Sequence, residues 1–375
     1  MAIPPSGSLS RRRFLHVASV GSTALFGGAP LRAWAEAMAG NGGRPLGVAL
    51  LGLGMYSEGQ LGPSLRETKL CRLAGVVTGH PEKAARWARE YGLPEKNLYS
   101  YETLDRIADN PDIDIVYVVT PPALHREFVV RAAKAGKHVI SEKPLATSVE
   151  DCEAMIAACR EAKVRFSVGY RLFFEPHVAE LRRLARDGDF GPLTKMTGEF
   201  GFVFGERAWR VDKKLAGGGP MMDLGIYLIQ AACMAQDGAA PVAVTAHELP
   251  KKRPELFNEV EETMRFGLEF ADGARLDALA SFNQGGDSFR AEGAGGWIDF
   301  RPHAFAYRGI GCVTSRGTFD APIAVHEQAL QMDGFAKCVM TGERTPVPGE
   351  MGLRDIRILE AIYEAARTGR RTPVA

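Results

Sequence analysis

The sequence lacks the features that would place it among nucleic-acid-binding or membrane-spanning proteins. It has no excess of charge of either sign, because 46 Lys and Arg residues oppose 45 Asp and Glu residues and leave a formal net charge of +1. A nucleic-acid-binding surface normally needs a clustered basic excess. No apolar run reaches the roughly 18 residues of a membrane-spanning helix. We therefore predict a globular protein with no nucleic-acid partner and no stable membrane association.

The six cysteines form no recognisable disulfide framework or metal site, because no two are spaced as C-x-x-C. Cys152 and Cys159 stand seven residues apart on a predicted helix, about 10 Å along its axis, which is too far for a disulfide. We therefore expect buried free thiols and no bound metal.

The first 35 residues have the pattern of an export signal. Arg11, Arg12 and Arg13 stand directly before a weakly apolar stretch over 14–29, and Ala33-Trp34-Ala35 offers small residues to a signal peptidase. This combination is typical of the twin-arginine route, which exports folded proteins. We expect a signal peptide over 1–35, a short arm over 36–44 and a periplasmic mature chain. The alternative is a terminal tail that is only rich in small residues.

Strand and helix patterns alternate between residues 45 and 168. Short apolar runs predict strands at 46–51, 72–77, 113–119 and 138–141, and periodic segments predict helices at 57–66, 81–91, 123–135 and 149–162. Such alternation is typical of a parallel sheet wrapped by helices. We therefore predict a Rossmann-type domain over 45–168.

The pattern changes at residue 169. Helices are predicted at 177–186 and 221–234, followed by strands at 242–247, 259–270, 275–283, 288–292 and 297–301, with a hairpin turn at 271–274. Two more helices are predicted at 327–340 and 353–368. The fold class is thus α/β, with a second, α+β domain over 169–345 that has an open, mostly antiparallel sheet. We expect the C-terminal helix, within 346–375, to pack back on the core.

A glycine-containing loop follows the first strand and opens the first helix. Gly52 permits a tight turn, Gly54 lets the backbone approach a pyrophosphate, and Ser57 occupies a position where Gly or Ala is usual. The helix N-terminus would face the phosphate charge. Because the motif stands between a strand and a helix, we predict that residues 52–57, Met55 and Tyr56 included, bind a dinucleotide.

The tip of the second strand bears on the choice between NADP and NAD. An NAD site would place Asp or Glu there to bond the ribose 2′-hydroxyl, whereas the sequence reads Thr78-Gly79-His80-Pro81-Glu82-Lys83. A hydroxyl, an imidazole and an amine near a helix N-terminus suit a 2′-phosphate. We predict that Thr78, Gly79, His80 and Lys83 bind NADP in preference to NAD. The alternative is an ordinary solvated helix start.

Two clusters carry candidate catalytic side chains. Glu142-Lys143-Pro144 ends the strand 138–141, so Lys143 is either a surface lysine or a cation directed into the ligand cleft. Asp223 and Tyr227 follow the run Gly217-Gly218-Gly219 at a spacing of four, which places both on one helix face. The glycines let the backbone approach something closely at the helix entry. Without context, an Asp/Tyr pair at this spacing is usually a surface hydrogen bond.

Together these motifs resemble the glucose–fructose oxidoreductase and inositol dehydrogenase family, over about residues 46–371. The sequence is most similar to the glucose–fructose oxidoreductase branch. It shares that branch's twin-arginine signal, its 79–84 loop, Gly169-Tyr170-Arg171 and Trp209-Arg210. Tyr227 also stands where most inositol dehydrogenase-like members have histidine.

The resemblance implies roles for three catalytic residues. Tyr227 would be the general base that takes the proton of a sugar hydroxyl, and Asp223 would accept a hydrogen bond from a neighbouring hydroxyl. Lys143 would lower the pKa of Tyr227, because a phenol that titrates near its ordinary value of about 10 is a poor base at neutral pH. The converse, with Lys143 as the base and Tyr227 orienting the sugar, stays open.

The resemblance also implies further cofactor contacts. Arg171, Trp209 and Arg210 would line the nicotinamide side, and the loop from Pro121 to His125 would cover the cofactor. Pro122 departs from the asparagine common in relatives, and a plain helix-start role suits His125 equally well. The implied contacts beyond the first two cofactor loops are Tyr101, Pro121, Pro122, His125, Glu142, Lys143, Arg171, Trp209, Arg210 and Tyr307.

Export narrows the expected mechanism, because no NADP pool exists outside the cytoplasm and a released reduced cofactor would be lost. We predict a ping-pong enzyme with tightly bound NADP, which oxidises an aldose at C1 to its lactone and passes the hydride to a second sugar to give an alditol. Relatives that hold NADP permanently have a long Pro-rich arm, which is short here. An aldose–aldose pair is therefore at least as good a prediction as glucose–fructose.

Other functions compete with this one. The first is a conventional sugar or inositol dehydrogenase with exchangeable NAD(P). A second is an NAD-dependent glycosidase of the same superfamily, and a third is a non-catalytic sensor, against which the presence of Lys143, Asp223 and Tyr227 argues. By analogy to the family we expect a homo-oligomer formed through the C-terminal sheet.

Overall fold

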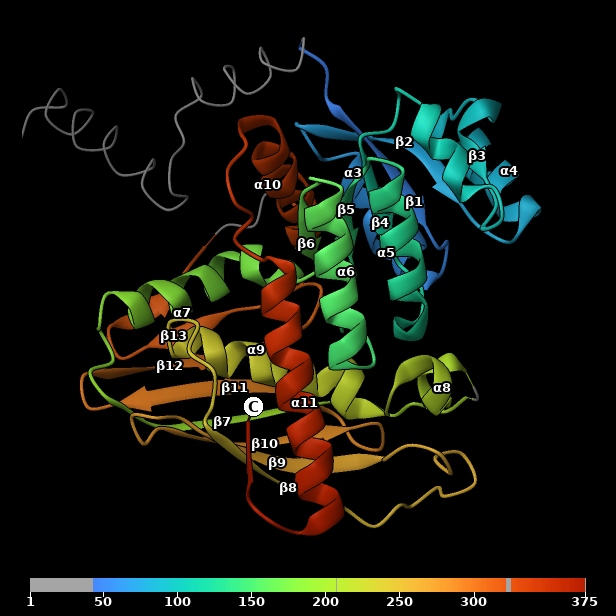
Figure 1. The fold of residues 1–375 in the computed structure, drawn as a ribbon. Helices are drawn as coiled ribbons and strands as arrows, with labels where there is room; N and C mark the ends of the chain where they lie inside the picture. The colour runs from blue at the N-terminus through green and yellow to red at the C-terminus, as the bar shows by residue number, and fades with distance from the viewer. Residues whose placement is uncertain (1–42, 207, 322–324, 375) are drawn as a thin grey trace, which may run out of the picture. The chain divides into compact units, whose positions relative to one another are not determined.

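A computed structural model describes residues 43–206, 208–321 and 325–374 of the chain. The predicted signal peptide over 1–35 and residues 36–42 of the predicted arm lie outside the described residues and stay predictions. Residues 45–375 form one unit with two β-sheets (Figure 1). No helix within the described ranges is long and apolar enough to cross a membrane.

The first sheet is parallel throughout, with the strand order β3-β2-β1-β4-β5-β6. This order confirms the predicted Rossmann-type fold. The chain changes direction across the sheet between β1 and β4, which leaves a crevice for ligands at the carboxyl ends of the strands. Both β1 and β4 are entirely buried, which explains their continuous apolar sequence. The strands are β1 (Leu46–Leu51), β2 (Cys71–Val77), β3 (Leu98–Tyr99), β4 (Ile115–Val118), β5 (His138–Ser141) and β6 (Phe166–Val168).

Helices connect these strands close to the predicted positions. Helix α4 (Pro81–Tyr91) begins with proline, which suits the first helical position, and α6 (Val149–Glu161) is capped by the Ser148 side chain. The predicted helix 57–66 begins as a π-helical turn, η1 (Ser57–Leu61), and continues as α3 (Gly62–Leu65). The other elements are η2 (Glu95–Asn97), η3 (Leu104–Asp109), η4 (Pro122–Leu124) and α5 (His125–Lys134).

The second sheet has the strand order β14-β13-β12-β11-β7-β10-β9-β8-β15. Its pairings are antiparallel except that of β7 with β10, so the mostly antiparallel prediction is confirmed. The predicted turn at 271–274 joins β9 to β10, with Gly273 at a φ of +91°. The strands are β7 (Leu193–Gly201), β8 (Ala243–Glu248), β9 (Thr263–Glu269), β10 (Arg275–Ser281), β11 (Gly286–Gly293), β12 (Gly296–Phe300), β13 (Cys312–Thr314), β14 (Gly317–Phe319) and β15 (Thr372–Pro373).

Strand β7 lies at the centre of this sheet, yet the sequence pattern does not predict it. Gly198 faces helix α9 (Ile226–Ala235), where a Cβ atom would come within 2.6 Å of the Leu228 side chain. Lys195 and Glu199 are exposed on the opposite face. Close packing against α9 thus requires glycine at an inward position, which removes the apolar alternation that marks a strand.

Helices α7 and α9 cover one face of the second sheet, and the long helix α11 runs alongside (Figure 1). Helix α11 packs against α6, which flanks the first sheet, and against β8 and α9 on the side of the second sheet. The remaining elements are η5 (Arg171–Phe174), α7 (Pro176–Arg186), η6 (Trp209–Val211), α8 (Lys213–Ala216), η7 (Met221–Gly225), α10 (Glu327–Thr341) and α11 (Gly349–Thr368).

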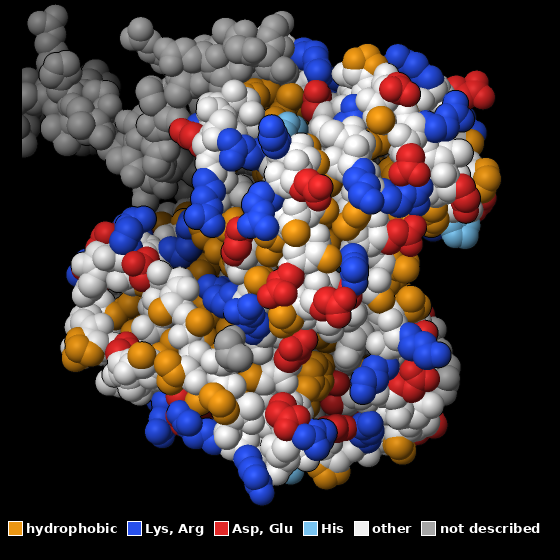
Figure 2. All heavy atoms as spheres, in the orientation of Figure 1, with side chains coloured by type: hydrophobic (Ala, Val, Ile, Leu, Met, Phe, Trp, Pro, Cys, Tyr) orange, Lys and Arg blue, Asp and Glu red, His pale blue; other side chains and the backbone are white. Residues whose placement is uncertain are grey.

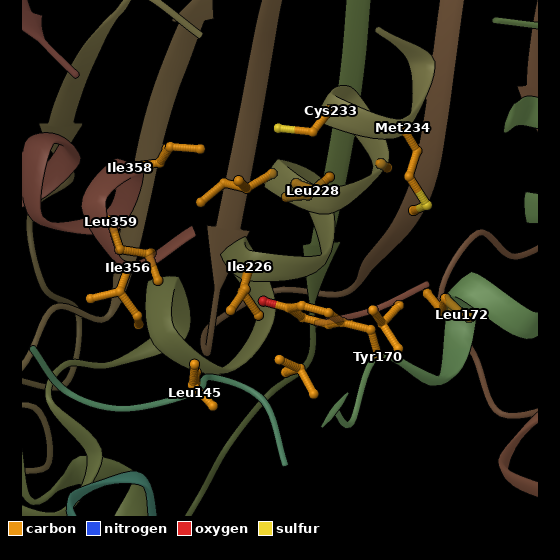
Figure 3. Packing of buried hydrophobic residues seen from close by; sticks show 14 of the residues in the cluster. Leu145, Tyr170, Leu172, Ile226, Leu228, Cys233, Met234, Ile356, Ile358 and Leu359 are labelled. Carbon is orange, nitrogen blue, oxygen red and sulfur yellow. The ribbon is translucent and has the colours of Figure 1, made fainter. Parts of the chain in front are cut away.

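The core between α9 and α11 has a buried polar centre. The Tyr170 ring lies among apolar side chains such as Leu172 and Ile226 (Figure 3). The fully buried Asp355 accepts hydrogen bonds from the Tyr170 hydroxyl and the Gln230 amide. Its carboxylate therefore joins Tyr170, the residue before η5, to α9 and α11. All six cysteines are buried free thiols, as predicted.

Charges of both signs are interspersed over the face drawn in Figure 2. The outer face of the second sheet is similarly mixed, since Arg265 pairs with Asp277 at 3.7 Å and Arg290 with Asp299 at 3.5 Å. This agrees with the near-neutral net charge. The oligomer expected through this sheet stays a prediction.

Asp355→Ala should lower the free energy of unfolding by about 3–5 kcal/mol, because it leaves the buried Tyr170 hydroxyl, the Gln230 amide and the Arg354 guanidinium without their acceptor. Urea denaturation followed by circular dichroism measures this. Glu364→Ala, on the exposed part of the same helix, should leave the midpoint near that of the wild type. Equal midpoints for the two variants would contradict the role given to Asp355.

Candidate active site

A cleft of about 880 Å³ opens at the carboxyl ends of the parallel strands and extends to the second sheet. Most of the predicted site residues line it, whereas Ser57, Gly79, Pro122 and His125 do not. Its predicted lining residues are Gly52, Gly54, Met55, Tyr56, Thr78, His80, Lys83, Tyr101, Pro121, Glu142, Lys143, Arg171, Trp209, Arg210, Asp223, Tyr227 and Tyr307.

The glycine loop has the geometry that a dinucleotide requires. Gly52 has a φ of +99°, and a Cβ atom there would come within 2.5 Å of the Val119 carbonyl oxygen. At Gly54 a Cβ atom would meet nothing within 4 Å, so the backbone is open to the cleft. The helical run 55–65 follows directly and presents its first N–H groups there. The Ser57 hydroxyl donates to the Gly52 carbonyl at 2.6 Å, so this hydrogen bond joins the two ends of the glycine loop.

The tip of β2 forms one end of the cleft. The Lys83 ammonium donates to the Leu53 carbonyl at 3.1 Å, which places a positive charge beside the glycine loop. A Cβ atom at Gly79 would come within 3.1 Å of the Tyr101 ring, so Gly79 lets that ring approach. No Asp or Glu of segment 76–101, all of which is described, lines the cleft. This end is therefore suited to an anionic group.

His125 supports the loop after β4 from beneath. Its ring is buried, with Nδ1 3.0 Å from the Leu145 carbonyl oxygen and Nε2 2.8 Å from the Thr120 carbonyl oxygen. Burial lowers the pKa of His125 below its usual value. Both nitrogens face backbone carbonyls, so the ring links two loops. His125 is also the first residue of α5, as the alternative of a helix-start role expects. Pro122 is likewise buried.

A cluster of charges joins the end of β5 to η7 and η6. The Lys143 ammonium donates to the Asp223 carbonyl oxygen at 2.8 Å and to its carboxylate at 3.2 Å. The Arg210 Nε atom donates to the other carboxylate oxygen at 3.0 Å. Burial acts to raise the pKa of Asp223, but Lys143 and Arg210 outweigh it and keep the pKa below its ordinary value. Asp223 is thus an ionised acceptor at neutral pH.

Tyr227 lies beside this cluster. The Lys143 Nζ atom is 4.5 Å from the centroid of the Tyr227 ring, and Phe200 packs edge-on against that ring with centroids 5.4 Å apart. Burial acts to lower the pKa of Lys143, but Tyr227 and Asp223 outweigh it and raise the pKa above its ordinary value. Lys143 is therefore a fixed cation at neutral pH. The structure thus brings the three predicted catalytic residues together.

Glu142 lies beneath Lys143 in a network that the sequence does not reveal. Its carboxylate accepts from the Tyr117 hydroxyl at 2.6 Å and from the Lys143 backbone N–H at 3.1 Å. Gln331 of α10 donates to the Tyr117 oxygen at 2.7 Å. Burial raises the pKa of Glu142 to about 7, although the Tyr117 hydroxyl and Lys143 act to lower it.

The glycine run before Asp223 serves packing of the protein itself. A Cβ atom at Gly218 would lie 1.9 Å from the Tyr363 hydroxyl oxygen, and one at Gly219 would lie 2.3 Å from the Glu261 carbonyl oxygen. The buried Glu261 carboxylate accepts the N–H groups of Gly219 and Met221, both at 3.0 Å, and so caps η7. Tyr363 and Glu261 are therefore the groups that approach the backbone of the glycine run closely. Both lie far away in the sequence, and no local signal marks them.

Two family models match most of this unit. Residues 46–170 match the oxidoreductase family with an NAD-binding Rossmann fold, and residues 178–299 match the GFO/IDH/MocA C-terminal domain. The chain belongs to the GFO/IDH/MocA oxidoreductase family. The predicted resemblance is confirmed, and the protein is an enzyme of the oxidoreductase class. In the part of the chain that the structure describes, no three His, Cys, Asp or Glu side chains gather so as to hold a metal ion.

Two relatives and one solved structure align with 80% to 92% of this chain. It is 29% identical to a D-xylose 1-dehydrogenase [NADP(+)] of Haloarcula marismortui, over 92% of this chain and 97% of that protein. It is 28% identical to a scyllo-inositol 2-dehydrogenase (NAD(+)) of Bacillus subtilis, over 80% of this chain and 87% of that one. An aldose–aldose oxidoreductase structure from Caulobacter crescentus matches with a TM-score of 0.85 and 43% identity, over 88% of this chain and 100% of the other.

Gly218→Ala should destabilise the protein by about 1–3 kcal/mol, because the new methyl group overlaps the Tyr363 side chain. Urea denaturation of the single variants and of Gly218→Ala with Tyr363→Ala should show that the double variant loses less stability than the sum of the two. Gly59→Ala, where a Cβ atom meets nothing within 4 Å, is the control. Additive losses at 218 and 363 would contradict the overlap.

Glu142→Gln should gain stability relative to the wild type as the pH rises. The folded-state pKa of Glu142, about 7, lies above the ordinary 4.5, so its stabilising contribution is complete below 4.5 and is lost as the pH rises through 7. A neutral amide does not lose stability in this way, so the free energy of unfolding of Glu142→Gln should rise relative to that of the wild type by on the order of 3 kcal/mol over this pH range. Urea denaturation at a series of pH values measures it, with the exposed Glu90→Gln as control. Parallel pH curves for wild type and Glu142→Gln would refute this prediction.

Proposed function

We propose that this protein is an exported sugar oxidoreductase that holds NADP tightly and transfers a hydride from one aldose to a second sugar. One observation carries the proposal: Lys143, Asp223 and Tyr227 meet in the same cleft that begins at the glycine loop. The 43% identity to an aldose–aldose oxidoreductase, over the full length of that chain, supports aldoses as the substrates.

The residues along the cleft fit the parts of NADP. NADP would accept the hydride from one sugar and return it to the other. The open backbone at Gly54 and the following helix N-terminus would hold its pyrophosphate. Thr78, His80 and Lys83 would hold the 2′-phosphate at the end of the cleft where segment 76–101 contributes no carboxylate.

In the first half-reaction Tyr227 takes the proton of the aldose C1 hydroxyl while the C1–H bond breaks and its hydrogen leaves with the electron pair. The product is the lactone. The ionised Asp223 accepts a hydrogen bond from a neighbouring sugar hydroxyl and so orients the ring, and the Lys143 ammonium stabilises the oxygen that loses its proton. In the second half-reaction the carbonyl carbon of another sugar receives the hydride and its oxygen receives the proton from Tyr227, which gives the alditol.

Tyr227 suits the role of base better than Lys143 does. Lys143 donates to two acceptors of Asp223, and its pKa is raised above the ordinary value, so it has no free electron pair at neutral pH. Tyr227 lies against this cation and makes no such bond to Asp223. We therefore assign the proton transfer to Tyr227 and the fixed positive charge to Lys143.

The two half-reactions together consume no external cofactor. Export by the twin-arginine route, which we infer from residues 1–35, would deliver the protein folded and already loaded with NADP. A closed hydride cycle then explains how the enzyme turns over in a periplasm without a nucleotide pool.

Mature protein purified without added nucleotide should release about one NADP per chain on denaturation. Glucose or xylose should reduce the bound cofactor, and a second sugar should reoxidise it, as followed by nicotinamide absorbance. Tyr227→Phe should release the same nucleotide but reduce it at least about 100-fold more slowly, because it keeps the cofactor loops and loses the base. Protein that carries no nucleotide would refute the closed cycle.

The conventional dehydrogenase is the second candidate, and the 29% identity to an NADP-dependent D-xylose 1-dehydrogenase favours it. The same experiment separates the two. A conventional enzyme would be isolated empty and would oxidise a sugar only when NAD(P)⁺ is supplied, with one reduced nucleotide released for each sugar oxidised.

A further inference from the structure

The segment after β12 carries a tyrosine across the cleft to the glycine loop. The Tyr307 ring lies against the Tyr56 ring, with centroids 5.9 Å apart and ring planes inclined by 33°. Tyr56 follows β1 of the first sheet, whereas Tyr307 follows β12 of the second sheet. Both residues line the cleft. The two rings therefore connect loops of the two sheets across the cleft.

This ring contact lies at the surface of the cleft. The Tyr307 residue is 42% exposed, and Met55, which precedes Tyr56, is 73% exposed. Because both are open to solvent, the rings meet beside the opening of the cleft and not in the core. A contact at this place can obstruct the passage of a ligand between the cleft and the solvent.

The backbone around Tyr307 is held in place by two other side chains. Asp287 on β11 accepts the backbone N–H groups of residues 304 and 305, at 2.9 and 2.7 Å. Arg171 on η5 donates to the carbonyl groups of residues 305 and 306, at 3.3 Å for the second. These hydrogen bonds do not involve the Tyr307 side chain. A substitution at Tyr307 should therefore leave the course of the segment unchanged.

Arg171 also contacts the Tyr307 ring itself. Its Cζ atom is 4.4 Å from the Tyr307 ring centroid, within the range of a cation–π interaction. The Glu327 carboxylate accepts from the guanidinium at 2.6 Å, and the two side chains are only 3% and 4% exposed. A buried ion pair of this kind does not add stability by itself. Here it orients a guanidinium group that supports both the Tyr307 ring and its backbone.

We propose that Tyr307 and Tyr56 form a clasp across the cleft that slows the entry and release of NADP, and that Arg171 is the positioning residue that holds Tyr307 in this clasp. The proposal rests on the proposed function, in which NADP stays bound from one half-reaction to the next. A nucleotide that leaves past these rings must separate them, and so must one that enters. The clasp therefore acts on the rates in both directions more than on the affinity.

Tyr307→Ala should speed both the entry and the release of NADP by about threefold to tenfold, because the ring contact is lost. The Kd should stay within about twofold, since the two rates change together. Tyr307→Phe keeps the ring and should keep the wild-type rates. Arg308→Ala, an exposed change at the next position, is the matched control.

Two measurements give these rates without relying on sugar oxidation. For release, each protein is loaded with radiolabelled NADP⁺, freed from excess by gel filtration and chased with unlabelled NADP⁺, and the retained label is counted over time. For entry, stopped-flow fluorescence follows the binding of NADPH to protein from which charcoal has removed the nucleotide. Thermal denaturation verifies that each variant is folded.

The role of Arg171 is tested by a double-mutant cycle. Arg171→Lys keeps a charge opposite Glu327 but loses the planar group that lies against the Tyr307 ring. It should speed release by about twofold to fivefold alone and add nothing further to Tyr307→Ala. An equal acceleration in both backgrounds would reduce Arg171 to a structural role. The Tyr307 variants decide on the clasp alone if Arg171→Lys is unfolded.

The outcomes separate this proposal from the proposed function. Faster entry and release in Tyr307→Ala, with wild-type rates in Tyr307→Phe and Arg308→Ala, support the clasp. Faster release with unchanged entry would make Tyr307 an ordinary binding contact and overturn the clasp, and unchanged rates would overturn it as well. Wild-type protein isolated without nucleotide would contradict the closed hydride cycle, yet the two rates measured with supplied nucleotide would still decide on the clasp.

Discussion

The hydrogen bonds from Lys143 to Asp223 join the two halves of the cleft, and the arrangement of the site depends on them. One partner follows β5, the fifth strand of the first sheet, and the other lies on η7, 80 residues further along the chain. The ammonium binds both the backbone and the side chain of Asp223, so it fixes the position of η7 as well as a charge. Tyr227, one helical turn later, is thereby held against the same cation. Breaking a buried pair of this kind leaves an uncompensated charge, so the loss of either partner alone costs stability.

Much of this site could be predicted because its key residues lie at the ends of strands or in short motifs. Once a strand–loop–helix pattern is recognised, the topology of a parallel sheet places Gly52, Gly54, Lys143 and their neighbours at one edge. Ser57 and His125 belong to the same motifs, yet their side chains bond to backbone carbonyls instead of facing the cleft. A motif fixes where the backbone runs, whereas the direction of a side chain depends on what packs around it.

The residues that support the site could not be predicted, because their partners are distant in sequence and carry no local pattern. Glu261 caps the turn that bears Asp223 from 40 residues away, and Glu327 holds Arg171 across a separation of 156. Strand β7 was hidden for a related reason, since Gly198 replaces the apolar residue that its inward position would otherwise require. In each case a tertiary contact requires the residue, and its type alone does not reveal that contact in the sequence.

The proposed cycle places an unusual demand on its base, because one group serves both half-reactions. The same phenol must take a proton from the first sugar and return one to the second, so it acts as base and as acid in alternate half-reactions. Each cation beside the Tyr227 ring is paired with a carboxylate, Lys143 with Asp223 and Arg171 with Glu327. These pairs hold both cations beside the Tyr227 ring, so the charges around the phenol keep the same positions in both half-reactions.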